Sequence, residues 1–116
     1  MRVQVQGAAL TLELSGEIDH HSAAELRDKV DKAYERSGCK HIVFDFTDVA
    51  FMDSSGIGMI IGRYKNAEKR GGQVALAGMC REVQRIFDIS GLSKIARAYA
   101  TPAEAVRELE SEARHG

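Results

Sequence analysis

The chain has 116 residues, enough for one domain with a hydrophobic core of its own. Its hydrophobic fraction of 44% and its charged fraction of 28% are ordinary for a globular protein. A general binder of nucleic acid or of anionic membranes needs an excess of Lys and Arg, and the net charge of −1 argues against that class.

Two further features bear on where the protein works. No apolar run approaches the roughly 20 residues that span a bilayer, and the N-terminal segment lacks the apolar core of a signal peptide. Cys39 and Cys80 belong to no CxxC pair, so we expect free thiols in a reducing compartment. The sequence therefore predicts a cytoplasmic protein.

The N-terminal segment predicts a β-hairpin. Apolar and polar residues alternate over residues 3–5 and again over residues 10–14, and Gly7-Ala8 can turn the chain between them. Alternation of this kind places the apolar side chains on one face, so we expect the hairpin to bury one face. Residues 16–19 end its second strand.

A helix is predicted next. Asp19 or Ser22 can act as its N-cap, and Gly38 suits the left-handed position that follows a helix. The apolar residues between these signals recur at helical spacing: Ala23, Leu26, Val30, Ala33 and Tyr34.

The centre of the chain predicts an interior strand and a second helix. Residues 41–46 are mostly β-branched or aromatic, which is typical of a strand covered on both faces, and residues 47–52 follow. The second helix ends at Gly71-Gly72, and its apolar stripe consists of Ile57, Ile60, Ile61, Tyr64 and Ala67. On its other face, Arg63 and Lys65 are expected to be ordinary solvated charges, although they can also attract an acidic partner.

The C-terminal third predicts two short strands, each followed by a helix. Residues 73–78 form another interior strand, and the apolar residues of 83–87 mark a short helix closed by Ser90-Gly91. Residues 95–99 predict a last strand, and Thr101-Pro102 supplies an N-cap and a first residue for the last helix.

The alternation of strands and helices predicts an α/β fold. We expect a single domain over residues 1–116, with a mixed sheet of about four to five strands packed with about four helices. Residues 113–116 are expected to be a frayed tail.

The most informative stretch is Asp53-Ser54-Ser55-Gly56-Ile57-Gly58, which follows an apolar run and opens a helix. A hydroxyl at a helix start can cap the helix, attack a substrate or accept a phosphate. Capping by Asp53 or Ser54 uses one side chain only. Each glycine inside a helix costs roughly 1 kcal/mol relative to Ala, so Gly56 and Gly58 suggest that something approaches the backbone closely.

Catalysis and phosphate-loop chemistry lack the necessary residues. A nucleophile elbow reads GxSxG, but Met52 and Asp53 occupy the positions two residues before the serines. His20 and His21 lie near the same sheet edge, so a serine–histidine contact stays open, but no third member or oxyanion pocket is evident. No GxxxxGK[ST] motif is present.

A phosphate-accepting serine is compatible with these residues. A phosphate adds about −1.5 to −2 charges at pH 7, and a helix N-terminus tolerates it within the molecule. A partner docked over the site would have to desolvate that charge. Phosphorylation can therefore abolish binding without changing the fold.

Three segments of the chain carry a family resemblance: residues 16–21 (GEIDHH), residues 51–58 (FMDSSGIG) continuing into residues 62–65 (GRYK), and residues 83–92 (VQRIFDISGL). Together they resemble the STAS family, the sulphate transporter and anti-sigma factor antagonist domain. They occur in the family's order along nearly the whole chain. The histidine pair and the GRYK continuation favour the sporulation branch of the family.

The resemblance implies a regulatory protein that is not an enzyme and needs no cofactor. Its unphosphorylated form would bind an anti-sigma factor that is also a serine kinase, and would thereby release a sporulation sigma factor. The kinase would use ATP to phosphorylate Ser55, with Ser54 as the rival acceptor, and a PP2C-type phosphatase would reverse the step. The residues expected at the partner-binding site are Asp19, His20, Asp53, Ser54, Ser55 and Gly56.

Several alternatives stay open on the sequence alone. The chain could serve another partner-switching pathway, such as general stress or biofilm control. A small nucleotide-binding or hydrolytic enzyme is a third hypothesis, from a different class. A metal site at His20-His21 is not expected, because adjacent helical side chains diverge by about 100°.

Overall fold

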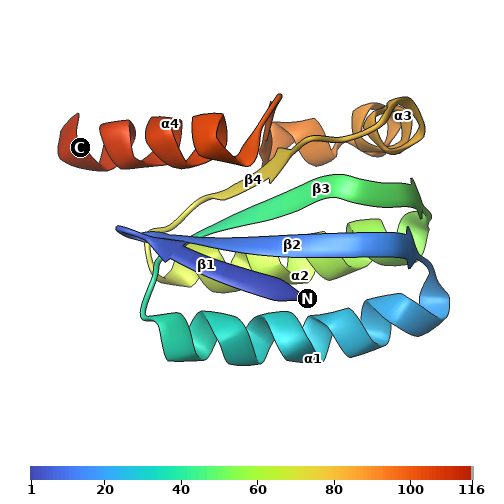
Figure 1. Cartoon of the computed structure of the whole chain (residues 1–116), viewed down its shortest axis with the longest axis horizontal. Coiled ribbons are helices and arrows are strands. Elements are labelled where there is room, and N and C mark those ends of the chain that lie inside the picture. The colour runs from blue at the N-terminus through green and yellow to red at the C-terminus, as the bar shows by residue number, and fades with distance from the viewer. Residues whose placement is uncertain (116) are drawn as a thin grey trace.

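The computed structural model describes residues 1–115, with side chains as far as Ser111, as a sheet packed between helices (Figure 1). The elements in chain order are β1 Arg2–Gln6, β2 Ala9–Ile18, α1 His20–Ser37, β3 His41–Met52, α2 Ser54–Lys69, β4 Val74–Ala77, α3 Arg81–Ser90, the 3-10 helix η1 Leu92–Lys94, β5 Arg97–Tyr99 and α4 Pro102–His115. This order confirms the predicted α/β fold and its leading hairpin. The predicted frayed tail, 113–116, includes Gly116 and side chains outside the described residues, so it stays a prediction.

The sheet has five strands in the order β1-β2-β3-β4-β5. β1 runs antiparallel to β2, and every other neighbouring pair is parallel. Parallel neighbours need helical crossovers, and α1, α2 and α3 supply them. The sheet is therefore mixed, as predicted.

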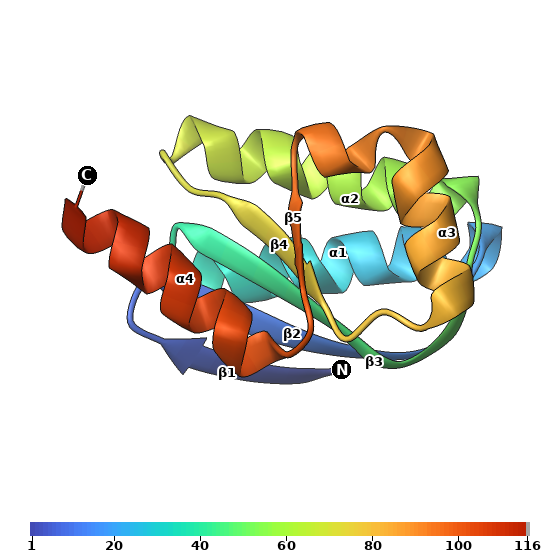
Figure 2. The same cartoon turned by 90° about the horizontal axis from the view of Figure 1, so that it is seen from above.

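Helices cover both faces of the sheet. Figures 1 and 2 show α1 and α2 on one face and α3 and α4 on the other. The larger hydrophobic core includes Leu12, Phe44 and Ile60, while small residues of the sheet such as Ala75 and Ala77 pack with Leu109 of α4. The face opposite α1 and α2 thus carries small side chains where α4 packs.

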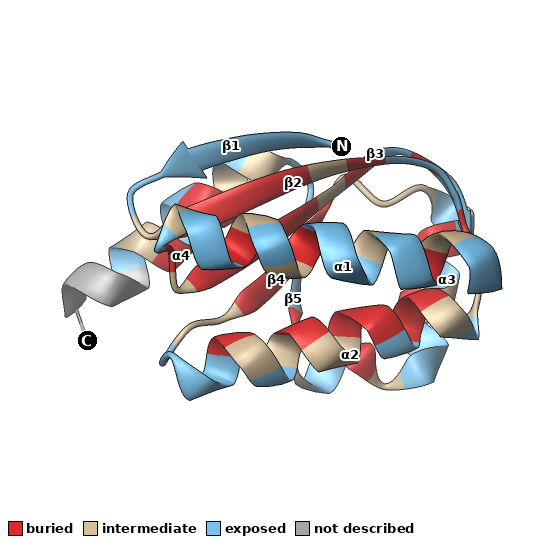
Figure 3. Cartoon of the chain, turned by 90° about the horizontal axis from the view of Figure 1, so that it is seen from below, coloured by how far each residue is buried: buried red, intermediate tan, exposed pale blue. Residues whose placement is uncertain are grey.

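Two expectations about burial are wrong. Every residue of β1 is exposed, because β1 is an edge strand that neither helical layer covers (Figure 3). Only the β2 half of the hairpin is buried. Arg63, expected on the solvated face of α2, is only 8% exposed because it lies between α1 and α2.

The ends of β2 and β3 determine where the next two helices start. The pairing between these strands shifts register at two places, and Gly16 beside one of them has φ +80°. Such β-bulges bend a strand, and glycine accepts the left-handed φ at little cost. After the shifts, Ile18 lies opposite Met52, so both strands end at the same level.

Candidate functional site

The starts of α1 and α2 are neighbours at the carboxyl edge of the sheet. Ile18 and Met52 are paired as the last residues of β2 and β3, and the N–H of Asp53 donates to the carbonyl of Ile18 at 3.1 Å. Asp19 and Asp53, the next residues along each chain segment, are the N-caps of the two helices. The structure therefore brings the GEIDHH and FMDSSGIG segments together.

Asp53 takes the capping role at the start of α2. Its Oδ1 accepts the Ser55 N–H at 2.8 Å, and its carbonyl accepts the Gly56 N–H at 3.0 Å. Neither the Ser54 nor the Ser55 hydroxyl makes a hydrogen bond to another described residue. Capping therefore leaves both serine hydroxyls available for another purpose.

The two serines have different surroundings. Ser54 is exposed, whereas Ser55 is half-buried and lines a groove between α1 and α2. We call this the α1–α2 groove. Its α1 side consists of His20, Ala23, Ala24 and Arg27. Its α2 side consists of Ser55, Gly58, Met59, Gly62 and Arg63.

The glycines of α2 have different reasons for lacking a side chain. A Cβ on Gly56 would lie 2.4 Å from Cγ of buried Met52 and 3.0 Å from a methyl of Ile18, so packing requires glycine there. A Cβ on Gly58 or Gly62 would meet nothing within 4 Å. The close approach inferred from the sequence is therefore internal at Gly56, and open space is left only at Gly58 and Gly62.

Asp19 forms a capping box with Ser22 at the start of α1. Asp19 Oδ1 accepts the N–H groups of His21 and Ser22, both at 3.0 Å, and the Asp19 N–H donates to Ser22 Oγ at 2.9 Å. The hydrogen bonds to the Asp19 carboxylate, led by that from the Ser22 N–H and joined by the Ser22 hydroxyl and the His21 N–H, lower the pKa of Asp19 from its ordinary value of 3.8, against a smaller opposing effect of burial. The two candidate caps suggested by the sequence thus act together.

The capping box predicts a pH effect on stability. Because the folded protein lowers the pKa of Asp19, its ionised form stabilises the fold above the ordinary pKa, and this stabilisation is lost as pH falls through the lowered value. An Asp19→Asn variant still caps the helix but does not titrate. Its melting temperature should therefore fall less than that of the wild type between pH 5 and pH 3 in calorimetry. Equal falls would contradict this role.

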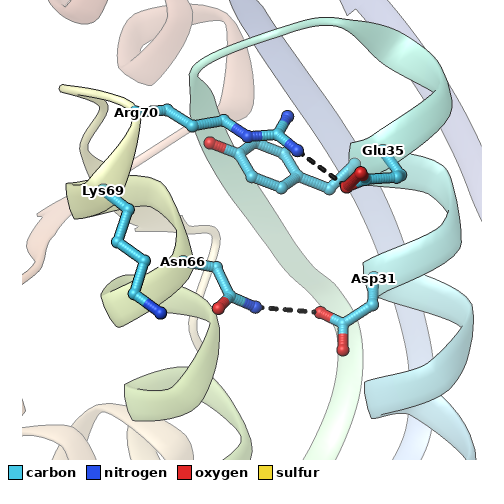
Figure 4. Close-up of a pocket in the computed structure, with 6 residues that line it drawn as sticks. Asp31, Glu35, Asn66, Lys69 and Arg70 are labelled. Carbon is cyan, nitrogen blue, oxygen red and sulfur yellow. Dashed lines mark hydrogen bonds and ion pairs between the residues drawn. The ribbon is translucent and has the colours of Figure 1, made fainter.

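Polar contacts join α1 and α2 beyond the groove. Arg70 reaches Glu35 at 2.7 Å and Asn66 reaches Asp31 at 3.3 Å (Figure 4). Arg70 also lies 4.4 Å from the centre of the Tyr34 ring. These contacts add to the apolar packing that holds α1 and α2 side by side.

Of the predicted site residues, only His20 and Ser55 line the α1–α2 groove. Asp19 and Asp53 cap the two helices, and Ser54 is exposed outside the groove. His20 and Ser55 share the groove, but Ser55 has no hydrogen bond to a histidine in the described part of the chain, so the serine–histidine pair of a hydrolase is not assembled. Gly56 is buried, so only its backbone is available to a partner. Across the described residues, no three His, Cys, Asp or Glu side chains gather as metal ligands.

Of the groove lining, the sequence predicted only His20 and Ser55 as site residues, and Gly62 and Arg27 are among those that were missed. Gly62 is four residues after Gly58 and lies on the same side of α2, a spacing that could have been noticed. Arg27 carried no signal, because an isolated arginine on a helix is usually a solvated charge. Only the packing of α1 against α2 places it beside the groove.

Comparison with known proteins identifies the family. The STAS domain profile matches residues 1–105, which is most of the chain. The chain belongs to the STAS-domain family. Within that family, it is 44% identical over 101 residues to the anti-sigma F factor antagonist of Paenibacillus polymyxa, covering 87% of this chain and 86% of that one. It is 36% identical over 86 residues to the anti-sigma-B factor antagonist of Bacillus subtilis, covering 74% and 77%.

Solved structures of STAS proteins have the same fold. The anti-sigma factor antagonist SpoIIAA in its unphosphorylated form superposes with a TM-score of 0.81 at 29% identity, covering 95% of this chain and 96% of that one. The Bacillus cell fate determinant SpoIIAA in its phosphorylated form superposes with a TM-score of 0.70 at 30% identity, covering 92% and 96%. No helix in the described part of this STAS protein is long and apolar enough to cross a membrane.

Proposed function

We propose that this STAS protein is an anti-sigma factor antagonist that acts in the cytoplasm as a binding module and not as an enzyme. The observation that carries the proposal is the 44% identity, over most of both chains, to an anti-sigma F factor antagonist. The site is compatible with binding, because the serine motif lies at a surface groove and lacks a paired base. Its partner would be an anti-sigma factor, and binding would free the sigma factor.

The proposed switch is phosphorylation of Ser55 by an anti-sigma factor that is also an ATP-dependent serine kinase. The free hydroxyl of Ser55 at a helix N-terminus supports this, because the helix dipole tolerates a phosphate there. The existence of unphosphorylated and phosphorylated forms of SpoIIAA, which has the same fold, also supports it. A PP2C-type phosphatase would regenerate the binding form, and partner contacts would come from Asp19, His20, Asp53, Ser54, Ser55 and Gly56.

The pathway has two candidates. The identity to the anti-sigma F factor antagonist favours sporulation, whereas the 36% identity to an anti-sigma-B factor antagonist keeps a general stress pathway as the alternative. Neighbouring genes distinguish them, because an adjacent sporulation sigma gene with an anti-sigma kinase gene supports the first.

The direct test mixes the protein with its cognate anti-sigma F factor, the matching sigma factor and ATP. We expect the unmodified protein to displace sigma, and we expect mass spectrometry to find phosphate on Ser55 after incubation. Ser54 is one residue away, more exposed and equally free, so it is an internal control for site choice. Failure to displace sigma would overturn the proposed function, and phosphate on Ser54 alone would overturn the site assignment.

A further inference from the structure

The α1–α2 groove is lined by two arginines, a histidine, a methionine and small residues. Arg27, Arg63 and His20 line it, and no carboxylate does. Four other surface hollows among the described residues each include at least one Asp or Glu. In a chain whose net charge is −1, this lining favours an anionic group, although Asp28 and Asp31 outside the lining each contact one of the two arginines.

The guanidinium of Arg63 is the unusual element of the groove. Its side chain is only 9% exposed, and Nε lies 2.8 Å from Asp31 Oδ1 as an ion pair without the alignment of a hydrogen bond. Nη1 is buried and has no hydrogen-bond partner among the described residues. Burial lowers the pKa of Arg63, while Asp31 opposes that effect. Asp31 offsets much of the charge of Arg63, so the guanidinium contributes to the groove chiefly through this unmatched buried donor, which favours an anionic acceptor nearby.

Arg27 supplies an accessible cation on the opposite wall. Its side chain is 55% exposed, and its contact with the adjacent Asp28 is a long surface ion pair of 3.5 Å. Exposed pairs of this kind contribute little and exchange readily. The guanidinium of Arg27 is therefore available to bind a carboxylate in the fork geometry that arginine favours.

We propose that the α1–α2 groove receives an Asp or Glu side chain of the anti-sigma partner, bound by Arg27 and attracted by the buried Arg63. The floor at Gly58 and Gly62 leaves open space, so a partner segment can enter close to the α2 backbone. This inference rests on the proposed function and specifies the chemistry of its partner.

The same arrangement specifies how the switch works. Ser55 lines the groove that also contains Arg27 and Arg63. A phosphate on Ser55 would place about −1.5 to −2 charges beside the incoming carboxylate. Like charges repel and the phosphate also competes for the arginine cations, so phosphorylation expels this partner side chain.

The test compares charge reversals on α1. Binding of the cognate anti-sigma F factor is measured by calorimetry for the wild type, for Arg27→Glu and for Lys32→Glu, an exposed residue of the same helix outside the groove. We expect Arg27→Glu to weaken binding about 30-fold or more, within the range found for close interfacial charge pairs. Lys32→Glu should change the dissociation constant less than threefold.

Charge rescue and a second arginine variant complete the test. Among partner variants in which single Asp or Glu residues are changed to Arg, one should bind the Arg27→Glu protein at least tenfold more tightly than the unchanged partner does. Arg63→Lys keeps the charge and should bind more tightly than Arg63→Met, with melting temperatures measured for both. If the wild type binds but Arg27→Glu binds equally well, the groove inference is overturned and the proposed function stands. If the wild type does not bind, the proposed function itself is overturned.

Discussion

Replacing Ser55 with Asp is expected to weaken binding to the anti-sigma factor about 100-fold or more, while the fold stays intact. Ser55 is half-buried in the α1–α2 groove, so a docked partner would remove a charge at this position from water. In a groove that we assign to an acidic partner side chain, juxtaposing a like charge costs several kcal/mol, and each ~1.4 kcal/mol is tenfold in affinity. The fold should tolerate the change, because the Ser55 hydroxyl makes no hydrogen bond within the described residues.

Two variants control for the Ser55 effect. Ser54→Asp adds the same charge one residue earlier on an exposed side chain outside the groove, and should weaken binding much less. Ser55→Ala should bind like the wild type and resist inactivation by kinase and ATP. Calorimetry gives the affinities, and circular dichroism checks the fold. Equal affinities for Ser55→Asp and the wild type would show that local charge is not the switch.

Alanine at Gly56 and alanine at Gly58 are expected to have opposite effects on stability. Both substitutions gain helix propensity, roughly 1 kcal/mol at an open site. At Gly56 the new methyl would lie 2.4 Å from Met52 Cγ, whereas at Gly58 it meets nothing within 4 Å. Overpacking a core costs about 1–3 kcal/mol, so Gly56→Ala should be less stable than Gly58→Ala by about that amount. For a chain of 116 residues, each kcal/mol moves the melting temperature by about 4 °C.

For Gly58→Ala, stability and affinity for the anti-sigma factor should change in opposite directions. Gly58 lines the α1–α2 groove, so its new methyl occupies space that we assign to the partner. Gly58→Ala should therefore melt above the wild type but bind the anti-sigma factor more weakly. Gly62 also faces open space in the groove, so Gly62→Ala should likewise melt above the wild type and bind more weakly. If Gly58→Ala is more stable than the wild type and binds the anti-sigma factor equally well, the groove is not part of the binding interface.

Local patterns were sufficient to predict most secondary structure. Helix caps are short-range hydrogen bonds, so Asp19, Gly38 and Thr101 could be identified from their immediate neighbours. Strand burial was harder to predict, because alternation in β1 does not reveal that no helix covers an edge strand. Val3 and Val5 are consequently exposed although their pattern is that of a half-buried strand.

The candidate site was predicted only in part, because local patterns identify its segments but not the packing between them. The sequence order of the GEIDHH and FMDSSGIG segments, each at a strand end, was enough to expect them at one sheet edge. The burial of Arg63 was missed because its charge suggested a solvated position, although it follows buried Ile60 by three residues and precedes buried Ala67 by four. Its ion-pair partner Asp31 lies 32 residues earlier on another helix, so no local pattern predicts this contact.

The sequence alone was enough to identify the family and the order of elements, and to predict the serine motif as the candidate site. These follow from local periodicity and from a motif whose residues are adjacent in the chain. Only the tertiary structure distinguished the serines and the glycines, because burial depends on what packs against each residue. Asp53 caps α2, Gly56 packs on Met52, and Ser55 lies in a groove whose other wall is α1.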